Sequence, residues 1–167
     1  MPILDEHTLD FFSHSPAQTR RFGVRLGLLV EAGDLICLEG ELGTGKTCLI
    51  QGVGEGMGVV EPLTSPTFIL IAEYRPPAPA PPLYHVDLYR LNEAVDEALA
   101  VGLDDYLLGN GVCLIEWAER IRPALPDERL WITLRHLDVS KRGIVMTATG
   151  ARYDELLREF RRTAFGV

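Results

Sequence analysis

The segment that most constrains this chain is "GELGTGKT", which spans residues 40–47. It matches the pattern G-x-x-x-x-G-K-[ST], in which the backbone N–H groups of a glycine-rich loop surround phosphate groups. The apolar run "LICLE" (35–39) precedes it and predicts a buried strand. Apolar residues at helical spacing follow it (Leu49, Ile50, Val53 and Met57). The sequence therefore predicts a strand, a phosphate-binding loop and a helix in direct succession.

The residue types of this loop suit the chemistry of a nucleoside triphosphate. Three glycines let the backbone turn tightly around an anion (Gly40, Gly43 and Gly45). The amides from Gly43 to Thr47, including that of Thr44, can point at the phosphates from the start of a helix, where the helix dipole also favours an anion. Lys46 can reach the β- and γ-phosphates, and the Thr47 hydroxyl can bind Mg²⁺. Because the chain lacks an N-K-x-D motif for reading guanine, we expect ATP.

The remaining segments predict one α/β domain over residues 1–167. Ser15 is a predicted helix N-cap, with Pro16 at the first helical position and Gln18 completing a capping box, and Gly33 is the predicted C-cap. The residues before Ser15 predict a short edge strand. Apolar stretches predict five more strands (66–75, 83–91, 111–117, 129–137 and 142–150), and two short helices broken at Gly102 are predicted within 92–108.

This order predicts a three-layer α/β fold of the P-loop NTPase type, with parallel central strands and antiparallel strands at the edges. The proline-rich segment 76–82 predicts a stiff surface loop in a hairpin. A charged helix is predicted at the C-terminus. Four glycines interrupt the helix after the phosphate loop (Gly52, Gly54, Gly56 and Gly58), and each interior glycine is less favourable than alanine by ~1 kcal/mol. Either that helix packs very closely against the sheet, or it ends early.

Two acidic residues are candidates for the metal and the attacking water. In "VCLIE" (112–116), four apolar residues lead to Glu116, which fits the acid that holds Mg²⁺ at the end of a neighbouring strand. In "YHVDLYRL" (84–91), side chains alternate across a strand and place Asp87 on one face with His85 and Tyr89. That face either looks toward the nucleotide, where Asp87 could orient water or hold a metal-bound water, or it is a solvent face.

The stretch "TSPTFIL" (64–70) places hydroxyl side chains at the head of an apolar run. After a phosphate loop and its helix, such a hydroxyl often senses the γ-phosphate. Thr67 and Ser65 are therefore candidates for a switch-like segment, with Pro66 restricting the turn. The alternative is that Thr67 simply begins a strand.

Charge and composition restrict the partners. The net charge is −8, and the only cluster of arginines alternates with acids near the C-terminus, so we expect any contact with RNA to run through a partner. No apolar run approaches the ~20 residues needed to cross a bilayer. The N-terminus lacks a secretory signal, and the three cysteines (Cys37, Cys48 and Cys113) predict reduced thiols. We expect a cytoplasmic protein without membrane contact.

Together, "GELGTGKT", "SPTF", "YHVDLYRL" and "GVCLIEWAER" resemble the bacterial TsaE family, also called YjeE, in order and approximate spacing. The resemblance extends from about Ser15 to Arg142. It implies an ATPase that supports threonylcarbamoyladenosine synthesis on the adenosine next to the anticodon of tRNAs that read codons beginning with A. It also implies binding to the TsaD and TsaB proteins, with ATP hydrolysis resetting that complex and the partners carrying the tRNA.

The resemblance also implies roles for individual residues. Thr44 to Leu49, with Cys48 between them, match the nucleotide-binding loop, Thr47 and Glu116 match the Mg²⁺ ligands, and Lys46 and Asp87 match catalytic positions. Three more positions are implied to lie beside the nucleotide (Trp117, Arg142 and Pro16, the last bordering the base). Cys48 and Ala118 depart from the family pattern, which often has Thr and Pro there. The rival readings are a small-molecule kinase, a GTPase and a non-catalytic nucleotide-binding module.

Overall fold

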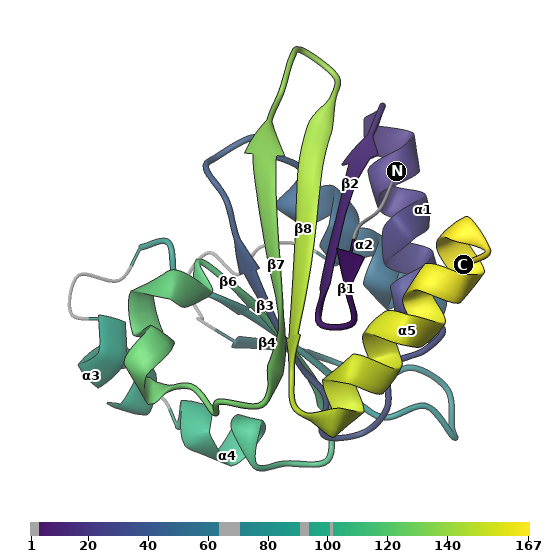
Figure 1. The fold of residues 1–167 in the computed structure, drawn as a ribbon. Coiled ribbons are helices and arrows are strands. Elements are labelled where there is room, and N and C mark those ends of the chain that lie inside the picture. Colours follow the sequence, from purple (N-terminus) through teal and green to yellow (C-terminus); the bar gives the residue numbers. More distant parts are fainter. Residues whose placement is uncertain (1–3, 64–70, 91–93, 101) are drawn as a thin grey trace.

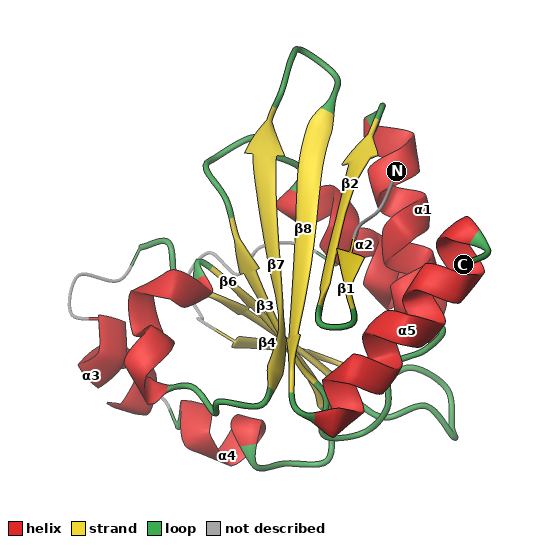
Figure 2. Cartoon of the chain, viewed as in Figure 1, coloured by secondary structure: helices red, strands yellow, loops and turns green. Residues whose placement is uncertain are grey.

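The computed structural model describes residues 4–63, 71–90, 94–100 and 102–167 (Figures 1 and 2). Its strands form one sheet in the order β1-β2-β8-β7-β3-β6-β5-β4. The strands are β1 (Leu4–Asp5), β2 (Thr8–Ser13), β3 (Leu35–Glu39), β4 (Ile71–Tyr74), β5 (Leu83–Asp87), β6 (Val112–Glu116), β7 (Arg129–His136) and β8 (Arg142–Thr149). The helices are α1 (Pro16–Gly27), α2 (Lys46–Met57), α3 (Ala94–Ala100), α4 (Leu103–Leu107), the 3₁₀ helix η1 (Ala118–Ala124) and α5 (Ala151–Phe165).

The middle of the sheet is parallel, as predicted. β3 pairs in parallel with β7 and with β6, and β6 pairs in parallel with β5. β3 and β6 are buried almost throughout, because helices cover both faces of the sheet: α1, α2 and α5 lie on one side, and α3 and η1 on the other (Figure 1). The carboxyl ends of parallel strands meet at one edge of a sheet, where open α/β folds place their ligand sites.

Antiparallel strands flank this parallel middle. β8, β2 and β1 continue the sheet beyond β7, and β4 pairs with β5 on the other side. The short edge strand predicted before Ser15 is confirmed as β1, and the same segment also contains β2, which lies between β1 and β8. The predicted hairpin around 76–82 is confirmed, and its tip residues Pro77, Ala78 and Pro79 are exposed. Of the strand predicted over 66–75, residues 66–70 lie outside the described chain.

Two of the four glycines mark close packing, and the partner is α1 instead of the sheet. Gly54 lies against the Leu63 side chain, and Gly58 is the C-cap that follows the last residue of α2. Glycines of both helices face each other across the contact (Gly23 and Gly27 of α1, Gly52 and Gly56 of α2). A Cβ atom added at Gly52 would overlap the carbonyl oxygen of Arg20. The glycines therefore let the two backbones touch, which places the first turn of α1 beside the first turn of α2.

The predicted N-cap of α1 is confirmed, but the predicted C-cap is not. The Ser15 side chain accepts a hydrogen bond from the backbone of Gln18, with Pro16 at the first position. The helix ends at Gly27 with Leu28 as its C-cap, so the prediction of Gly33 was wrong. Gly33 instead has a φ of 92° in the turn that leads into β3.

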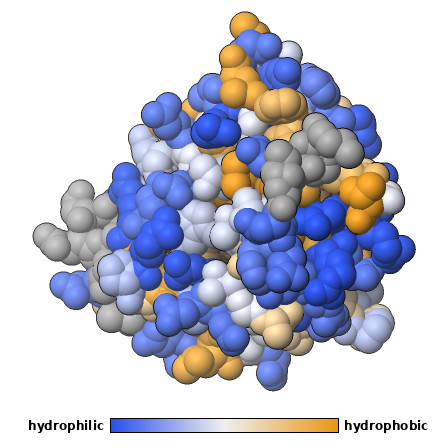
Figure 3. Space-filling view, viewed as in Figure 1, coloured by the Kyte–Doolittle hydropathy of each residue, from blue (hydrophilic) through white to orange (hydrophobic). Residues whose placement is uncertain are grey.

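The visible surface is mainly hydrophilic, with separate apolar spots (Figure 3). One of them lies at the tip of the β7–β8 hairpin, where Leu137 and Val139 are exposed (Figures 1 and 3). Among the described helices, none has the length and apolar character that crossing a membrane requires.

Candidate functional site

The loop between β3 and α2 has the geometry of a phosphate cradle. Gly43 and Gly45 have φ values of 78° and 98°, which favour glycine. Gly45 is the N-cap of α2, so no side chain caps the start of this helix. At Gly40, a Cβ atom would lie 2.8 Å from both the Leu134 carbonyl oxygen and the Thr44 hydroxyl. Thr44 is buried and donates from its hydroxyl to the Glu41 carbonyl over 2.8 Å. The predicted strand, loop and helix are therefore observed, and the start of α2 presents backbone N–H groups toward the loop.

Lys46 is folded back over this loop. Its Nζ contacts the Gly40 carbonyl oxygen and donates to the Glu41 carbonyl over 3.1 Å. The same Nζ lies 4.2 Å from the centre of the Trp117 ring, which is a cation–π distance. The side chain is only 5% exposed. Lys46 is thus held by groups that phosphate oxygens could replace.

Acidic side chains from three segments converge on Lys46. Burial lowers the pKa of Lys46, and the charges of Glu116, Glu119 and Asp87 oppose that shift. Asp87 and Glu116 are direct partners in the β5–β6 register, at the carboxyl ends of their strands. The structure therefore brings together Lys46, Asp87 and Glu116, which lie far apart in the sequence.

Glu116 is a buried carboxylate with a histidine as its partner. Its Oε2 lies 2.7 Å from Nε2 of His85, and both side chains are almost completely buried. In the described part of the chain, no Lys or Arg forms an ion pair with Glu116. The strand face that carries His85, Asp87 and Tyr89 is therefore buried at His85 rather than exposed to solvent. Nor does His85 point toward a nucleotide, since it is buried against Glu116.

Thr47 and Glu116 carry oxygen atoms of the kind that bind Mg²⁺ in proteins. Thr47, at the start of α2, offers a hydroxyl, and Glu116 offers a carboxylate in the acidic surroundings of Lys46. Mg²⁺ prefers oxygen ligands and usually keeps waters and substrate phosphates, so one or two protein ligands suffice. Among the described residues, no group of three or more His, Cys, Asp or Glu side chains that could hold a metal ion is found.

Trp117 adopts a strained backbone next to this site. Its φ of 60° is in the left-handed region, which is uncommon for a residue other than glycine. The indole ring lies 5.0 Å from the ring of Tyr89 and 5.3 Å from the guanidinium of Arg120. Backbone strain of this kind often occurs at functional sites. Here it turns the chain sharply after Glu116 and places the indole under Lys46.

Arg142 and the start of α1 also reach the loop. Arg142 donates to the Gly43 carbonyl over 3.3 Å, as well as to the Asp138 carbonyl. The methyl group of Thr19 would contact a Cβ atom at Gly45, which places the first turn of α1, including the exposed Pro16, near the loop. The loop residues Cys48 and Leu49 follow in the first turn of α2, where Cys48 is partly exposed and Leu49 buried. Thr67 lies outside the described residues.

Glu119 is the acid that sequence reasoning missed. It lies in η1, for which no element was predicted, and its Oε1 is buried without a hydrogen-bond partner among the described residues. Desolvation raises the pKa of its carboxyl, and the negative charge of Glu39 adds to that shift. The signal was present as a second acid in "EWAER", three positions after Glu116. It could not be used without knowing that the chain turns back toward Lys46.

The arginines after Trp117 do not form a kinase-like lid. Arg120 donates to the Tyr89 carbonyl over 2.6 Å. Arg122 stacks 3.8 Å from the Trp131 ring and lies 3.5 Å from Glu39. Both side chains therefore tie η1 to the ends of strands.

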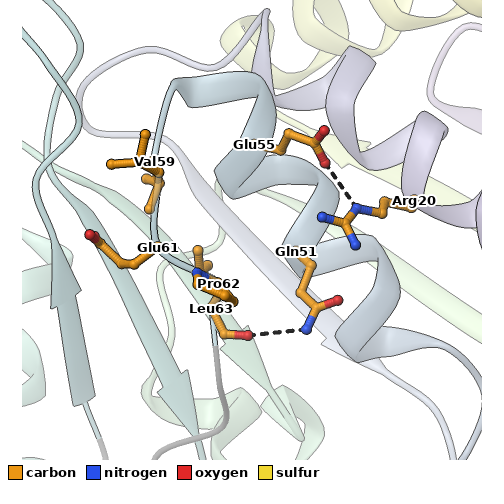
Figure 4. A pocket seen from close by; sticks show the side chains of 8 residues that line it. Arg20, Gln51, Glu55, Val59, Glu61, Pro62 and Leu63 are labelled. Carbon is orange, nitrogen blue, oxygen red and sulfur yellow. Dashed lines mark hydrogen bonds and ion pairs between the residues drawn. The ribbon is translucent and has the colours of Figure 1, made fainter.

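A separate hollow of about 420 Å³ lies between α1, α2 and residues 59–63 (Figure 4). Of its three charged residues, Arg20 and Glu55 already pair with each other, since Arg20 donates to Glu55 over 2.9 Å, and Glu61 is the third. Gln51 donates to the Leu63 carbonyl across the same hollow. The phosphate loop, rather than this hollow, is therefore the candidate site.

The geometry agrees with comparisons to known proteins. A family model described as "Threonylcarbamoyl adenosine biosynthesis protein TsaE" matches residues 13–144, which include every site residue described above. This chain belongs to the TsaE family. The Bacillus subtilis (strain 168) protein named "tRNA threonylcarbamoyladenosine biosynthesis protein TsaE" is 41% identical over 148 residues, covering 89% of this chain and 90% of the relative.

Other TsaE relatives give the same result. The protein of that name from Treponema pallidum (strain Nichols) is 40% identical, covering 80% of this chain and 96% of its own. The crystal structure of YdiB from Bacillus subtilis superposes with a TM-score of 0.78 at 37% identity, covering 94% of this chain and 96% of YdiB. The fold is thus shared over nearly the whole chain.

Proposed function

We propose that this chain is a Mg²⁺-dependent ATPase that supports the formation of threonylcarbamoyladenosine on tRNA. The observation that carries the proposal is the convergence of Glu116 and Asp87 on Lys46, beside a glycine loop that opens a helix. The chain's membership of the TsaE family supplies the pathway, since its relatives are named for tRNA threonylcarbamoyladenosine biosynthesis.

Each group in the site is proposed to bind either the phosphates or Mg²⁺. The amides of Gly43, Thr44 and Gly45 and those that begin α2 bind phosphate oxygens. Lys46 leaves the carbonyls of its own loop and binds the β- and γ-phosphates. Thr47 and Glu116 would hold Mg²⁺, which supplies positive charge against the phosphates when bound. Each of these groups acts by charge or by hydrogen bonding, so no covalent intermediate with the protein is needed.

Asp87 is proposed to act on the attacking water. It lies beside Glu116 in the sheet register, and its Oδ1 accepts a hydrogen bond from the Tyr89 backbone over 2.9 Å. That bond holds the carboxylate at the end of β5. From there Asp87 orients the water or a metal-bound water, and so acts on turnover more than on ATP binding.

The nucleotide is proposed to extend from the loop along Cys48 and Leu49 toward Pro16, where the base lies. Arg142 would contact a phosphate after its hydrogen bond to the Gly43 carbonyl breaks. Trp117 would line the site next to Lys46, whose Nζ lies over the indole ring. Thr67 is proposed to sense the γ-phosphate.

The proposed partners are TsaD and TsaB, with tRNA bound through them, and the proposed location is the cytoplasm. The net charge of −8 supports an indirect contact with tRNA, because a protein that holds RNA by itself usually presents a basic surface. ATP hydrolysis would reset the complex between turnovers. We therefore expect slow hydrolysis by the isolated chain and faster hydrolysis with the partners.

A reconstitution with TsaD, TsaB and tRNA tests this proposal, with ATP hydrolysis and tRNA modification measured together. Lys46→Ala should lower hydrolysis by a factor on the order of 100 or more, because it removes a positive charge from the developing phosphate charge. Arg158→Ala, which removes an exposed charge from α5, is the matched control and should change neither rate. Unchanged hydrolysis and modification in Lys46→Ala would refute the proposal, and phosphate transfer to a small acceptor would favour a kinase.

A further inference from the structure

A buried histidine lies directly behind the proposed metal ligand. His85 is 1% exposed, and its Nε2 lies 2.7 Å from Oε2 of Glu116. The contact runs diagonally between neighbouring parallel strands, because His85 of β5 pairs with Leu114 of β6, two residues before Glu116. Glu116 has no cationic partner among the described Lys and Arg residues. The histidine is therefore the group that determines how this carboxylate is oriented.

The other ring nitrogen determines the tautomer. Nδ1 of His85 is buried and has no hydrogen-bond partner in the described part of the chain. A proton on Nδ1 would be a buried donor without an acceptor, and it would leave the Nε2 lone pair facing a carboxylate oxygen. The arrangement that avoids both is a neutral ring with its proton on Nε2, donated to Oε2 of Glu116.

We propose that His85 is a positioning residue for the cation site: its Nε2–H holds Oε2 of Glu116 and leaves Oε1 for Mg²⁺. The inference rests on the proposed function, in which Glu116 is a Mg²⁺ ligand. Groups that hydrogen-bond to a metal ligand fix its orientation, and their loss typically weakens metal binding or activity by about 10- to 100-fold. Without the bond, the Glu116 carboxylate could rotate, and part of the binding free energy would be spent on fixing it.

The fold explains why a histidine can do this at position 85. His85 lies two residues before Asp87 on β5, so the two side chains share one face of the strand. Asp87 ends the strand at the site edge, and His85 lies deeper, between that edge and the core. One short segment thus supplies the proposed water-orienting acid and, beneath it, the support for the metal-binding acid of the next strand.

His85→Gln and His85→Met form a matched pair that tests the proposal. The two side chains are similar in length, but only Gln can donate an amide hydrogen bond to Glu116. The measurement is the binding of Mn²⁺ with ADP, followed by the electron paramagnetic resonance of free Mn²⁺. We expect His85→Met to weaken Mn²⁺ binding by about 10- to 100-fold and His85→Gln to remain much closer to the wild type. Equal weakening in both variants, or none in His85→Met, would overturn the proposal.

A second measurement on the unaltered protein does not depend on how the variants fold. Long-range ¹H–¹⁵N correlation spectra distinguish the two tautomers of neutral histidine, with His7, His14 and His136 as internal comparisons. We expect the His85 proton on Nε2, and a proton on Nδ1 would overturn the inference. If the wild type fails to bind Mn²⁺ with ADP, the proposed function fails. If the wild type binds it and His85→Met binds it equally well, only the role of His85 fails.

Discussion

Two buried carboxylates lie at opposite ends of the parallel strands, and their partners differ. Asp34, just before β3, is 4% exposed in its side chain and receives two hydrogen bonds from Arg152, at 2.9 and 2.7 Å. It also accepts from the Glu31 backbone N–H. Glu116, at the end of β6, is equally buried, but its partner in the described chain is His85 rather than an Arg or Lys. One carboxylate thus forms an ion pair with an arginine, and the other forms none with an Arg or Lys of the described residues.

The difference separates an ion pair that is complete within the fold from a carboxylate that is proposed to bind Mg²⁺. Arg152 links α5 to the start of β3, and Asp34 raises the pKa of the Arg152 guanidinium. A buried carboxylate without a cation is unfavourable unless something compensates it. At the Glu116 end, the nearby charges are Lys46, which is held by loop carbonyls, and the further acids Asp87 and Glu119. That end is therefore prepared for an additional cation, whereas the Asp34 end is complete.

The largest expected effect is on stability at the Asp34 end. Arg152→Met should lower the free energy of unfolding by about 3 kcal/mol, because it leaves Asp34 buried without its partner. Chemical denaturation measures this, and ATP hydrolysis per folded molecule should stay unchanged. Arg162→Met is the matched control, since Arg162 forms an exposed pair with Glu159 on the same helix, and exposed pairs contribute little to stability. Equal losses in the two variants would remove the distinction drawn for Asp34.

The opposite result is expected at the Glu116 end. Glu116→Gln should lower ATP hydrolysis by a factor on the order of 100, since a Mg²⁺ ligand loses its charge. The free energy of unfolding should be equal or higher, because a buried charge is removed while the amide oxygen can still accept from His85. Steady-state hydrolysis and denaturation measure the two effects. A large loss of stability in Glu116→Gln would show that both carboxylates serve the fold.

A smaller effect is expected in the pH dependence of stability. Desolvation raises the pKa of Glu119 above its ordinary 4.5, so the folded state binds this proton more tightly than the unfolded chain. Its contribution to stability is therefore fully present below about pH 4.5 and is lost as the pH rises through the folded-state pKa. Glu119→Gln should remove this part of the decline, as measured by denaturation at several pH values. Parallel curves for the two proteins would contradict the buried position of Glu119.

The smallest effect concerns the thiols. Cys37 and Cys113 are buried in the central strands, and burial raises the pKa of Cys37 to about 12 and that of Cys113 further. Cys48 is partly exposed in the first turn of α2. Iodoacetamide should therefore modify one thiol per native molecule, and Mg²⁺ with ATP should slow that reaction. Mass spectrometry identifies the position, and modification of a strand cysteine would show that the middle of the sheet opens.

Much of the site could be predicted from the sequence, because neighbouring residues encode the strand, the loop and the helix that form it. The strand, loop and helix of residues 35–57 were predicted correctly, since glycine spacing and apolar periodicity act over a few residues. The cap at Ser15 succeeded for the same reason. The end of α1 was misplaced, because the prediction took the next glycine that favours a turn, Gly33, as the C-cap, whereas the helix ends at Gly27 with Leu28 as its C-cap.

The contacts that distinguish the site depend on pairing between distant strands. The sequence alone determined the phosphate loop, the order of strands and helices, and the candidates Lys46, Asp87 and Glu116, because each is encoded by neighbouring residues. Only the tertiary structure decided that α1 rather than the sheet packs on the glycines of α2, that Glu119 turns back toward Lys46, and that His85 supports Glu116. These depend on which strands become neighbours, and that choice is made by the burial of the whole core rather than by any one segment.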